Sequence, residues 1–131
     1  MSVSYHWRGE FRNELVNQLH AESFRHRLFE DDWWAQVSRH SLGWVCAREG
    51  DGLVGFVNVA WDGALHAFVL DTMVSGRCRR QGIATGMLAL CVEEARRARC
   101  EWLHVDFGDE LRTLYFDSAG FVPTNAGLIK L

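Results

Sequence analysis

Proline is almost absent from this sequence: its 131 residues contain one, Pro123, near the C-terminal end. Clusters of proline and glycine mark linkers between domains, and no low-complexity or repeated segment is present to serve as one. A chain of this length has room for one domain. We therefore expect residues 1–131 to form a single domain.

Long apolar runs are missing as well. No stretch reaches the roughly 18 residues that a membrane-spanning helix requires. The first residues, Met1 to Arg8, contain no apolar region of the kind found in signal peptides. The sequence therefore predicts neither insertion into a membrane nor export, and we expect a cytoplasmic protein.

The chain also lacks an excess of positive charge, since its formal net charge is −3 and no run of five like charges occurs. Nucleic-acid binders usually carry a basic excess clustered on one face. The 4 cysteines form no CxxC pair and no zinc spacing with the 6 scattered histidines. We expect no nucleic-acid partner, no metal site, and thiols that stay reduced.

Aromatic residues, by contrast, are plentiful, with 6 Trp and 8 Phe. Apolar residues recur at near-helical spacing over residues 10–26, which predicts a first amphipathic helix. A short second helix follows from Trp33, with acidic residues at its positive end. Three extended segments at residues 42–48, 53–61 and 65–74 then predict an antiparallel meander.

The second half of the chain alternates between helix and strand. A loop at residues 75–82 precedes a strong helix at 83–99, a strand at 102–107, a helix at 109–119 and an extended segment at 121–131. This order predicts an α/β fold: a mixed central sheet with an antiparallel N-terminal meander, a parallel strand–helix–strand crossover and flanking helices.

The loop at residues 75–82 joins a strand to the start of a helix and contains Arg77, Arg79 and Arg80. Unpaired N–H groups and the dipole make a helix start a natural anion site, and Gly82 lets the backbone approach a phosphate closely. No Gly-Lys-Ser/Thr and no GxGxxG sequence is present, so an NTPase P-loop and a dinucleotide fold are excluded. On its residues alone, the loop is either a phosphate site or a solvated basic loop.

Two motifs narrow these alternatives. Arg79-Arg-Gln-Gly-Ile-Ala84 resembles the Arg/Gln-x-x-Gly-x-Gly/Ala signature of the GCN5-related N-acetyltransferase (GNAT) superfamily. Tyr115-Phe-Asp-Ser-Ala-Gly-Phe121 is similar to the superfamily's second signature, an aromatic helix that ends in Gly-Phe. The order of elements matches over nearly the whole chain. The resemblance implies an enzyme that transfers the acetyl group of acetyl-CoA to a primary amine, which we expect to belong to a small molecule.

The resemblance also implies where acetyl-CoA binds. Two neighbouring parallel strands would splay apart and admit the pantetheine arm, and backbone groups near Met73 and Val74 would hold that arm and polarise the thioester carbonyl. The amine would then attack directly in a ternary complex. The pyrophosphate would be held by the loop and the helix start, that is by Arg79, Arg80, Gln81, Gly82, Ile83, Ala84 and Thr85.

The sequence departs from the superfamily at the residue that protonates the leaving thiolate. The usual tyrosine lies five residues before the Phe of Gly-Phe, where this chain has Phe116. Tyr115 lies one residue earlier, about 100° around an α-helix. Tyr115 is therefore either the acid or a packed aromatic, with water protonating the thiolate. Asp71 and Asp106, carboxylates in or at the end of predicted strands, are candidate bases, and each has a structural role as its alternative.

Two alternatives to an enzyme that acetylates small molecules stay open at this stage. The chain could be a CoA-binding regulatory module without turnover, which Phe116 favours, or an enzyme that acetylates a protein N-terminus or lysine. The helices that bear Glu22, Trp33 and Trp34 would wall the acceptor pocket, although core packing is the alternative for the tryptophans. The extended segment at residues 122–131 has an apolar end, and unpaired sheet edges invite pairing between copies, so we also expect a homodimer.

Overall fold

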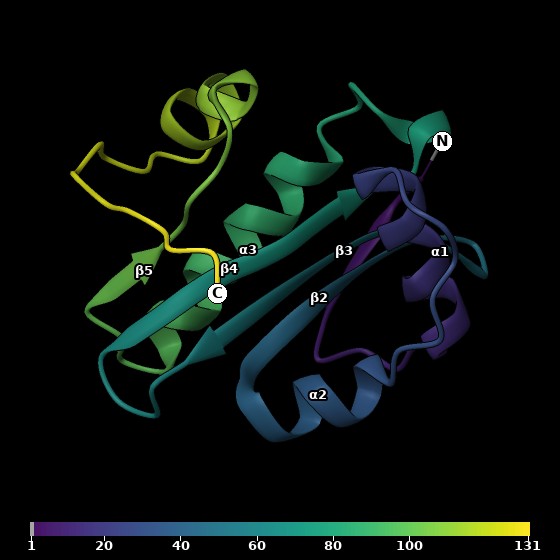
Figure 1. Cartoon of the computed structure of the whole chain (residues 1–131), viewed down its shortest axis with the longest axis horizontal. Coiled ribbons are helices and arrows are strands. Elements are labelled where there is room, and N and C mark those ends of the chain that lie inside the picture. Colours follow the sequence, from purple (N-terminus) through teal and green to yellow (C-terminus); the bar gives the residue numbers. More distant parts are fainter. Residues whose placement is uncertain (1) are drawn as a thin grey trace.

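The structure, a computed structural model, describes residues 2–131. Its centre is one mixed sheet with the strand order β1-β2-β3-β4-β5 (Figure 1). Neighbouring strands are antiparallel except β4 and β5, which are parallel. The strands are β1 (Ser4–Trp7), β2 (Ser41–Glu49), β3 (Gly52–Trp61), β4 (His66–Val74) and β5 (Trp102–His104). The predicted α/β fold is thus confirmed, including the meander and the parallel crossover.

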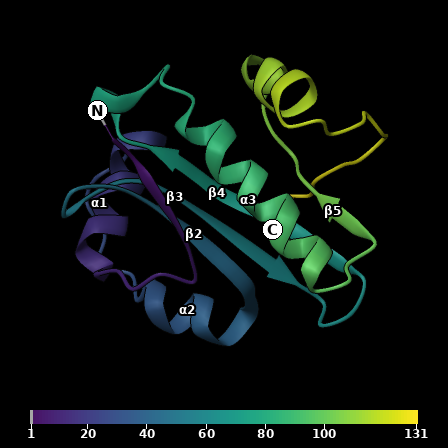
Figure 2. The ribbon, with the colours of Figure 1, turned by 180° about the vertical axis from the view of Figure 1, so that it is seen from behind.

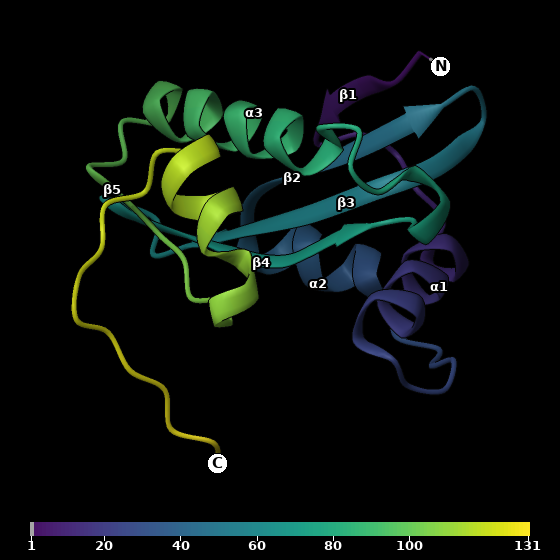
Figure 3. The ribbon, with the colours of Figure 1, turned by 90° about the horizontal axis from the view of Figure 1, so that it is seen from above.

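Helices cover both faces of the sheet. α1 (Asn13–Phe24) and α2 (Trp33–His40) lie on one face, and α3 (Ile83–Arg97) lies on the other (Figure 3). The chain between β4 and α3 contains a short 3₁₀ turn, η1 (Gly76–Cys78). After β5 come a second 3₁₀ turn, η2 (Asp109–Leu111), and a π-helix, η3 (Thr113–Ser118). η3 lies beside α3 (Figure 2), and its residue Tyr115 joins the core on the α3 face. No helix in the described range 2–131 has the length and apolarity that crossing a membrane requires.

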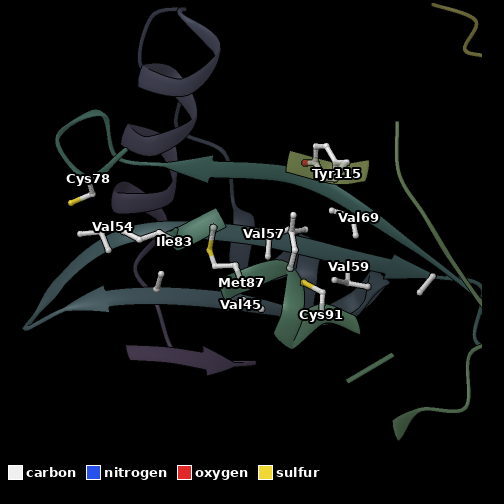
Figure 4. Close-up of a cluster of buried hydrophobic side chains, with 13 residues drawn as sticks. Val45, Val54, Val57, Val59, Val69, Cys78, Ile83, Met87, Cys91 and Tyr115 are labelled. Carbon is white, nitrogen blue, oxygen red and sulfur yellow. The ribbon is translucent and has the colours of Figure 1, made fainter. Parts of the chain in front are cut away.

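Alternating side chains of the strands build two separate cores. On the α3 face, Val45 and Val57 pack with Met87 and Cys91 (Figure 4). On the opposite face the core is aromatic, and Phe56 makes an edge contact with Phe11 at a centroid distance of 5.2 Å. The many aromatic residues of the sequence therefore pack mainly between the sheet and the first two helices.

The first strand, β1, was not predicted. Its side chains are mostly exposed, so it lacks the alternation of apolar and polar residues by which strands are recognised. It adds to the edge of β2, with Tyr5 opposite Ala47. A Cβ atom on Gly86 would lie only 2.6 Å from the ring of Tyr5, so the missing side chain lets α3 pack tightly against β1.

The C-terminal part differs most from the prediction. β5 ends at His104 instead of residue 107, and the predicted helix at 109–119 is divided into η2 and η3. Residues 121–131 were predicted to be a strand, but they pair with no strand in the described chain. They run away from the sheet on the side of α1 and α2 (Figure 3). Because a strand needs backbone hydrogen bonds to a neighbouring strand, this segment does not form one within the single chain.

Candidate functional site

The two parallel strands separate after a short contact. β4 and β5 pair only from His66 opposite Trp102 to Phe68 opposite His104, and the chain after β5 then turns away (Figure 1). The N–H of Ser75 donates to the carbonyl of Val54 at 2.8 Å. Because bonded pairs alternate along an antiparallel ladder, the peptide groups of Val74 point to the other edge, away from β3. In the described chain, no strand pairs with this outer edge of β4 beyond Phe68.

A β-bulge lies in the same part of β4. Phe56 is opposite Met73 and Asn58 is opposite Leu70, so β4 has one residue more than β3 between these pairs. The extra residue is accommodated at Asp71, whose φ of 56° lies in the left-handed region. Consequently the side chain of Asp71 faces α1, and that of its neighbour Thr72 faces η3.

The loop after β4 is held from two sides. The N–H of Gly76 donates to the carboxylate of Glu22 on α1 at 2.5 Å. The guanidinium of Arg77 forms an ion pair with Glu49 at 3.1 Å, which compensates its charge. Arg79 and Arg80 are exposed and form no ion pair with any residue in the range 2–131. The positive charge of the loop therefore comes from these two side chains.

The start of α3 leaves backbone donors available. Gly82 caps the helix in the left-handed conformation, with φ 77°, and no side chain caps this end. The first helical bond runs from the N–H of Gly86 to the carbonyl of Gly82, at 2.9 Å, so the N–H groups of residues 83–85 have no carbonyl partner within the helix. A Cβ atom on Gly82 would meet nothing within 4 Å. Free donors, a positive dipole end and open space fit a phosphate group.

Tyr115 lies directly opposite the bulge. Its side chain belongs to the core cluster drawn in Figure 4 and is 4% exposed. Its hydroxyl donates to the hydroxyl of Thr72 at 3.1 Å. Its ring stacks on Phe107 at a centroid distance of 4.6 Å. Burial raises the pKa of the Tyr115 phenol above its usual value of 10, and the bond with Thr72 opposes this only in part. Tyr115 therefore keeps its proton at neutral pH.

Tyr115 and Phe116 lie in a π-helix and not in the α-helix that the sequence predicts. The N–H of Ala119 donates to the carbonyl of Leu114, five residues back, at 2.9 Å. A π-turn is wider than an α-turn, so the 100° step of an α-helix does not apply. Phe116 instead packs against Arg112, whose guanidinium lies 5.1 Å from the ring centroid.

Asp71 is the half-buried carboxylate of the site. Burial raises its pKa, while His20 and Asn58 act in the opposite direction. The Nε2 atom of His20 lies 3.8 Å from the carboxylate oxygen Oδ1. Asp106, the other candidate base, lies beyond the end of β5 with an exposed side chain. The side chains of Asp71 and Tyr115 thus lie on opposite faces of the sheet at the bulge. The charge of Asp106 acts on Tyr115, where it adds to the rise in the pKa of the phenol.

Sequence reasoning missed two residues that complete this arrangement, Thr72 and His20. Thr72 gives no signal in the sequence because a regular strand would turn its side chain away from Tyr115. His20 occupies an ordinary position on α1. Within residues 2–131, no group of three or more His, Cys, Asp or Glu side chains is arranged to hold a metal ion.

The comparisons with known proteins agree with this geometry. Residues 5–121 match the model of the acetyltransferase (GNAT) family. The chain therefore belongs to this family, whose members are acetyl-CoA-dependent N-acetyltransferases. The predicted resemblance and the predicted enzyme class are confirmed at this level. No curated protein sequence matches the chain.

Solved structures show the same fold at low sequence identity. A GNAT family acetyltransferase from Streptococcus pneumoniae TIGR4 superposes with a TM-score of 0.78 at 21% identity, covering 99% of this chain and 98% of its own. A transcriptional regulator from Bacillus halodurans C-125 gives 0.82 at 16%, covering 99% of both chains. AAC(6')-Iy, in complex with the bisubstrate analogue CoA-S-monomethyl-acetylneamine, gives 0.77 at 14%, covering 100% of this chain and 98% of its own.

Proposed function

We propose that this chain transfers the acetyl group of acetyl-CoA to a primary amine of a small molecule, by direct attack in a ternary complex. The observation that carries the proposal is that β4, whose outer edge is unpaired beyond Phe68, leads into the uncapped start of α3 at Gly82. One feature suits the diphosphate of the cosubstrate and the other suits its extended arm. A relative of the same fold was solved with a CoA-containing bisubstrate analogue.

The proposed binding residues act mainly through their backbones. The side chain of Ile83 is buried in the core, so only its N–H group is available to a phosphate. Ala84 and Thr85 offer the next two N–H groups, and the exposed loop residues Arg79, Arg80, Gln81 and Gly82 complete the pyrophosphate site. Charge-assisted bonds of this kind contribute about 1.5–3 kcal/mol each, and less where they are exposed.

The pantetheine arm is proposed to lie along the open edge of β4. The peptide groups of Val74 point to this edge, whereas Met73 faces β3 and has its side chain 1% exposed in the aromatic core. Val74 is therefore the better donor for the thioester carbonyl, and Met73 fixes the position of Val74 by its packing.

The proposed chemistry uses the two faces of the bulge. The amine nitrogen bonds to the acetyl carbon and the carbon–sulfur bond breaks, which leaves a thiolate. Tyr115 gives its phenolic proton to that sulfur, since its raised pKa keeps the proton available. Asp71 accepts the proton of the amine, and its raised pKa makes it a stronger base than an exposed carboxylate. Asp106 remains a second candidate for this role.

The acceptor is proposed to bind on the α1 and α2 side of β4. Phe68 and Leu70 of β4 expose apolar surface there, and Trp34 is partly exposed. Trp33, by contrast, is a core residue. We infer a compact amine rather than a protein because AAC(6')-Iy, which has the same fold, was solved with the bisubstrate analogue CoA-S-monomethyl-acetylneamine.

We further propose that residues 1–131 act as one domain, in the cytoplasm and as a homodimer. The 4 cysteines are all free thiols, which suits a reducing compartment. The apolar side chains of Val122, Leu128 and Ile129 are largely exposed in the single chain, and a second copy of the chain would cover them.

Two measurements test the proposed activity. Acetyl-CoA at 100 times its dissociation constant should stabilise the fold by about 2.7 kcal/mol, so millimolar acetyl-CoA should raise the melting temperature more than ATP or NAD does. CoA release should then be measured over a panel of small amines, with peptides for comparison. Absence of any thermal shift would refute acetyl-CoA binding. A shift without turnover on any amine would favour a CoA-binding regulatory module.

A further inference from the structure

A row of polar groups leads from the β4 bulge to the surface. From Asp71 it continues to His20 on α1, whose Nδ1 atom lies 2.6 Å from Nε2 of His26. The Nδ1 atom of His26 lies 2.6 Å from the backbone carbonyl of Arg27. Arg27 begins the segment to Asp31 that lines a surface hollow of about 520 Å³.

The carbonyl at the end of this row fixes where the protons lie. A carbonyl only accepts, so Nδ1 of His26 carries a proton, and Nε2 of neutral His26 has a free lone pair. Nδ1 of His20 must then donate to that lone pair. Neutral His20 therefore has no proton on Nε2, the atom that faces Asp71 across 3.8 Å. The lone pair of His20 Nε2 and the carboxylate of Asp71 therefore face each other, and one added proton would form a hydrogen bond between them.

Burial favours the neutral form of His20, whose Nε2 atom is then free to receive a proton. Burial lowers the pKa of His20, and Asp71 and Asp31 raise it, while the neighbouring His26 lowers it. Burial also raises the pKa of Asp71. The two shifts bring the proton affinities of the carboxylate and the imidazole closer together, which lowers the free energy of transfer between them.

We propose that Asp71, His20 and His26 form a relay that carries the proton of the acceptor amine from the β4 bulge to the surface of the α1–α2 loop. The relay rests on the proposed function. The ammonium proton moves to Asp71 and on to Nε2 of His20, and the Nδ1 proton of His20 moves to Nε2 of His26. His26 then releases its own Nδ1 proton to water, so one proton enters the relay and one leaves it. Proton exchange with water after product release returns both imidazoles to the Nδ1-protonated tautomers from which the next cycle starts. His20 and His26 are relay residues that never touch the acetyl group.

The surroundings hold the relay in line. The ring of His20 lies between Phe24 and Trp33, at centroid distances of 4.6 and 5.4 Å. The loop that follows His26 is fixed by buried Asn17, which donates to the carbonyl of Asp31 at 3.0 Å and accepts from the indole of Trp33 at 3.1 Å. His20 thus has little freedom to rotate away from Asp71.

The relay is tested by comparing the variants His20→Gln and His26→Gln with the wild type and with His40→Gln, a control at the exposed end of α2. Glutamine keeps hydrogen-bonding capacity but cannot pass a proton on. We expect kcat to fall on the order of 10–10²-fold in both relay variants, at or below the lower range for proton-transfer groups, with the KM for acetyl-CoA unchanged. Added imidazole should restore part of the rate of His20→Gly in proportion to its concentration, which a merely structural role would not allow.

The outcomes separate the relay from the proposed function. If the wild type turns over an amine and both glutamine variants keep its rate and pH profile, the relay is wrong and the transferase function stands. If the wild type turns over no amine, the proposed function fails, and nitrogen-15 NMR still tests the relay by its tautomers. We expect neutral His20 and His26 both to carry the proton on Nδ1. A proton on Nε2 of neutral His20 would overturn the proposal.

Discussion

Tyr115 and Phe116 are adjacent aromatic residues with different surroundings, and only Tyr115 reaches β4 through its hydroxyl. If Tyr115 is the acid, Tyr115→Phe removes the proton donor and keeps the ring. Turnover should then fall about 10²–10⁴-fold, while the affinity for acetyl-CoA, measured by titration calorimetry, stays nearly the same. A loss of less than tenfold would mean that Tyr115 is only a packed aromatic and that water protonates the thiolate.

The companion variant tests the register of the π-helix. Phe116→Tyr, introduced together with Tyr115→Phe, places a hydroxyl at the position where the superfamily usually has one. Because Phe116 packs against Arg112 and not against Thr72, we expect this double variant to stay as slow as Tyr115→Phe in steady-state assays. Recovery of the rate would show that η3 adopts the ordinary α-helical register when acetyl-CoA is bound.

Asp71 combines an unfavourable backbone conformation with a half-buried charge. Its pKa is raised in the folded protein, so its contribution to stability is present below the unfolded pKa of 3.8 and is lost as the pH rises through the folded pKa. Asp71→Asn should therefore raise the melting temperature at pH 7, and the gain should shrink as the pH falls toward about 4. Asparagine also tolerates the left-handed conformation. A gain in melting temperature that does not change with pH would therefore come from this backbone preference and not from the charge. A melting temperature that falls at pH 7 would contradict the assigned charge penalty.

At the scale of elements, the sequence was sufficient wherever one segment alone determined the structure. The loop at residues 75–82 and the helix after it were predicted because glycine, arginine and helical periodicity are local signals. The bulge at Asp71 and the π-turn of η3 were not predicted, since both depend on contacts between distant segments, such as the bond from Tyr115 to Thr72. The sequence therefore named Tyr115 and Asp71 as candidate residues, but it did not predict the bulge that places their side chains on the two faces of β4.

The helix start at Gly82 gives an element-scale prediction with a matched control. Gly82→Glu should abolish acetyl-CoA binding, because the added side chain fills open space beside the free N–H groups and its charge repels phosphate. Gly63→Glu introduces the same charge at another left-handed glycine with open space, φ 81°, in the turn before β4. Both variants carry a similar backbone strain of about 1–2 kcal/mol. We expect both to lose similar stability in thermal melts, and only Gly82→Glu to lose acetyl-CoA binding by calorimetry.

An unchanged affinity of Gly82→Glu would show that the loop is a solvated basic loop and that the pyrophosphate lies elsewhere. Equal loss of binding in both variants would point to general destabilisation instead. Because the side chain of Gly82→Glu would meet no atom of the folded chain within 4 Å of its Cβ, a properly folded variant is expected, which makes the comparison decisive.

At the scale of the whole molecule, the sequence predicted the mixed sheet, because the order of helical and extended periods admits few topologies. It failed at the two ends of the chain, for different reasons. β1 joins the sheet although its side chains are mostly exposed, and the segment at residues 121–131 has apolar residues but joins no sheet of its own chain. Whether a segment joins the edge of a sheet depends on the free backbone groups of the strand beside it. The apolar and polar pattern of the segment itself does not specify this.

The C-terminal segment provides the whole-molecule prediction. Val122, Leu128 and Ile129 are 83%, 78% and 87% exposed. Apolar side chains that are exposed together often mark a surface that binds another protein. If a second copy covers them, the wild type should have twice the mass of one chain in light scattering at micromolar concentrations. Removal of residues 124–131 should give the mass of one chain, and so should the double variant Leu128→Asp, Ile129→Asp, since buried charges oppose association.

The same experiment has an internal check, because residues 124–131 are exposed throughout and make no buried contact in the single chain. Their removal should leave the circular dichroism spectrum unchanged. The melting temperature of the wild type should rise with protein concentration, as mass action requires for a dimer, while that of the truncated chain should not. A wild-type mass of one chain at every concentration would show that the exposed apolar segment serves some purpose other than joining two copies.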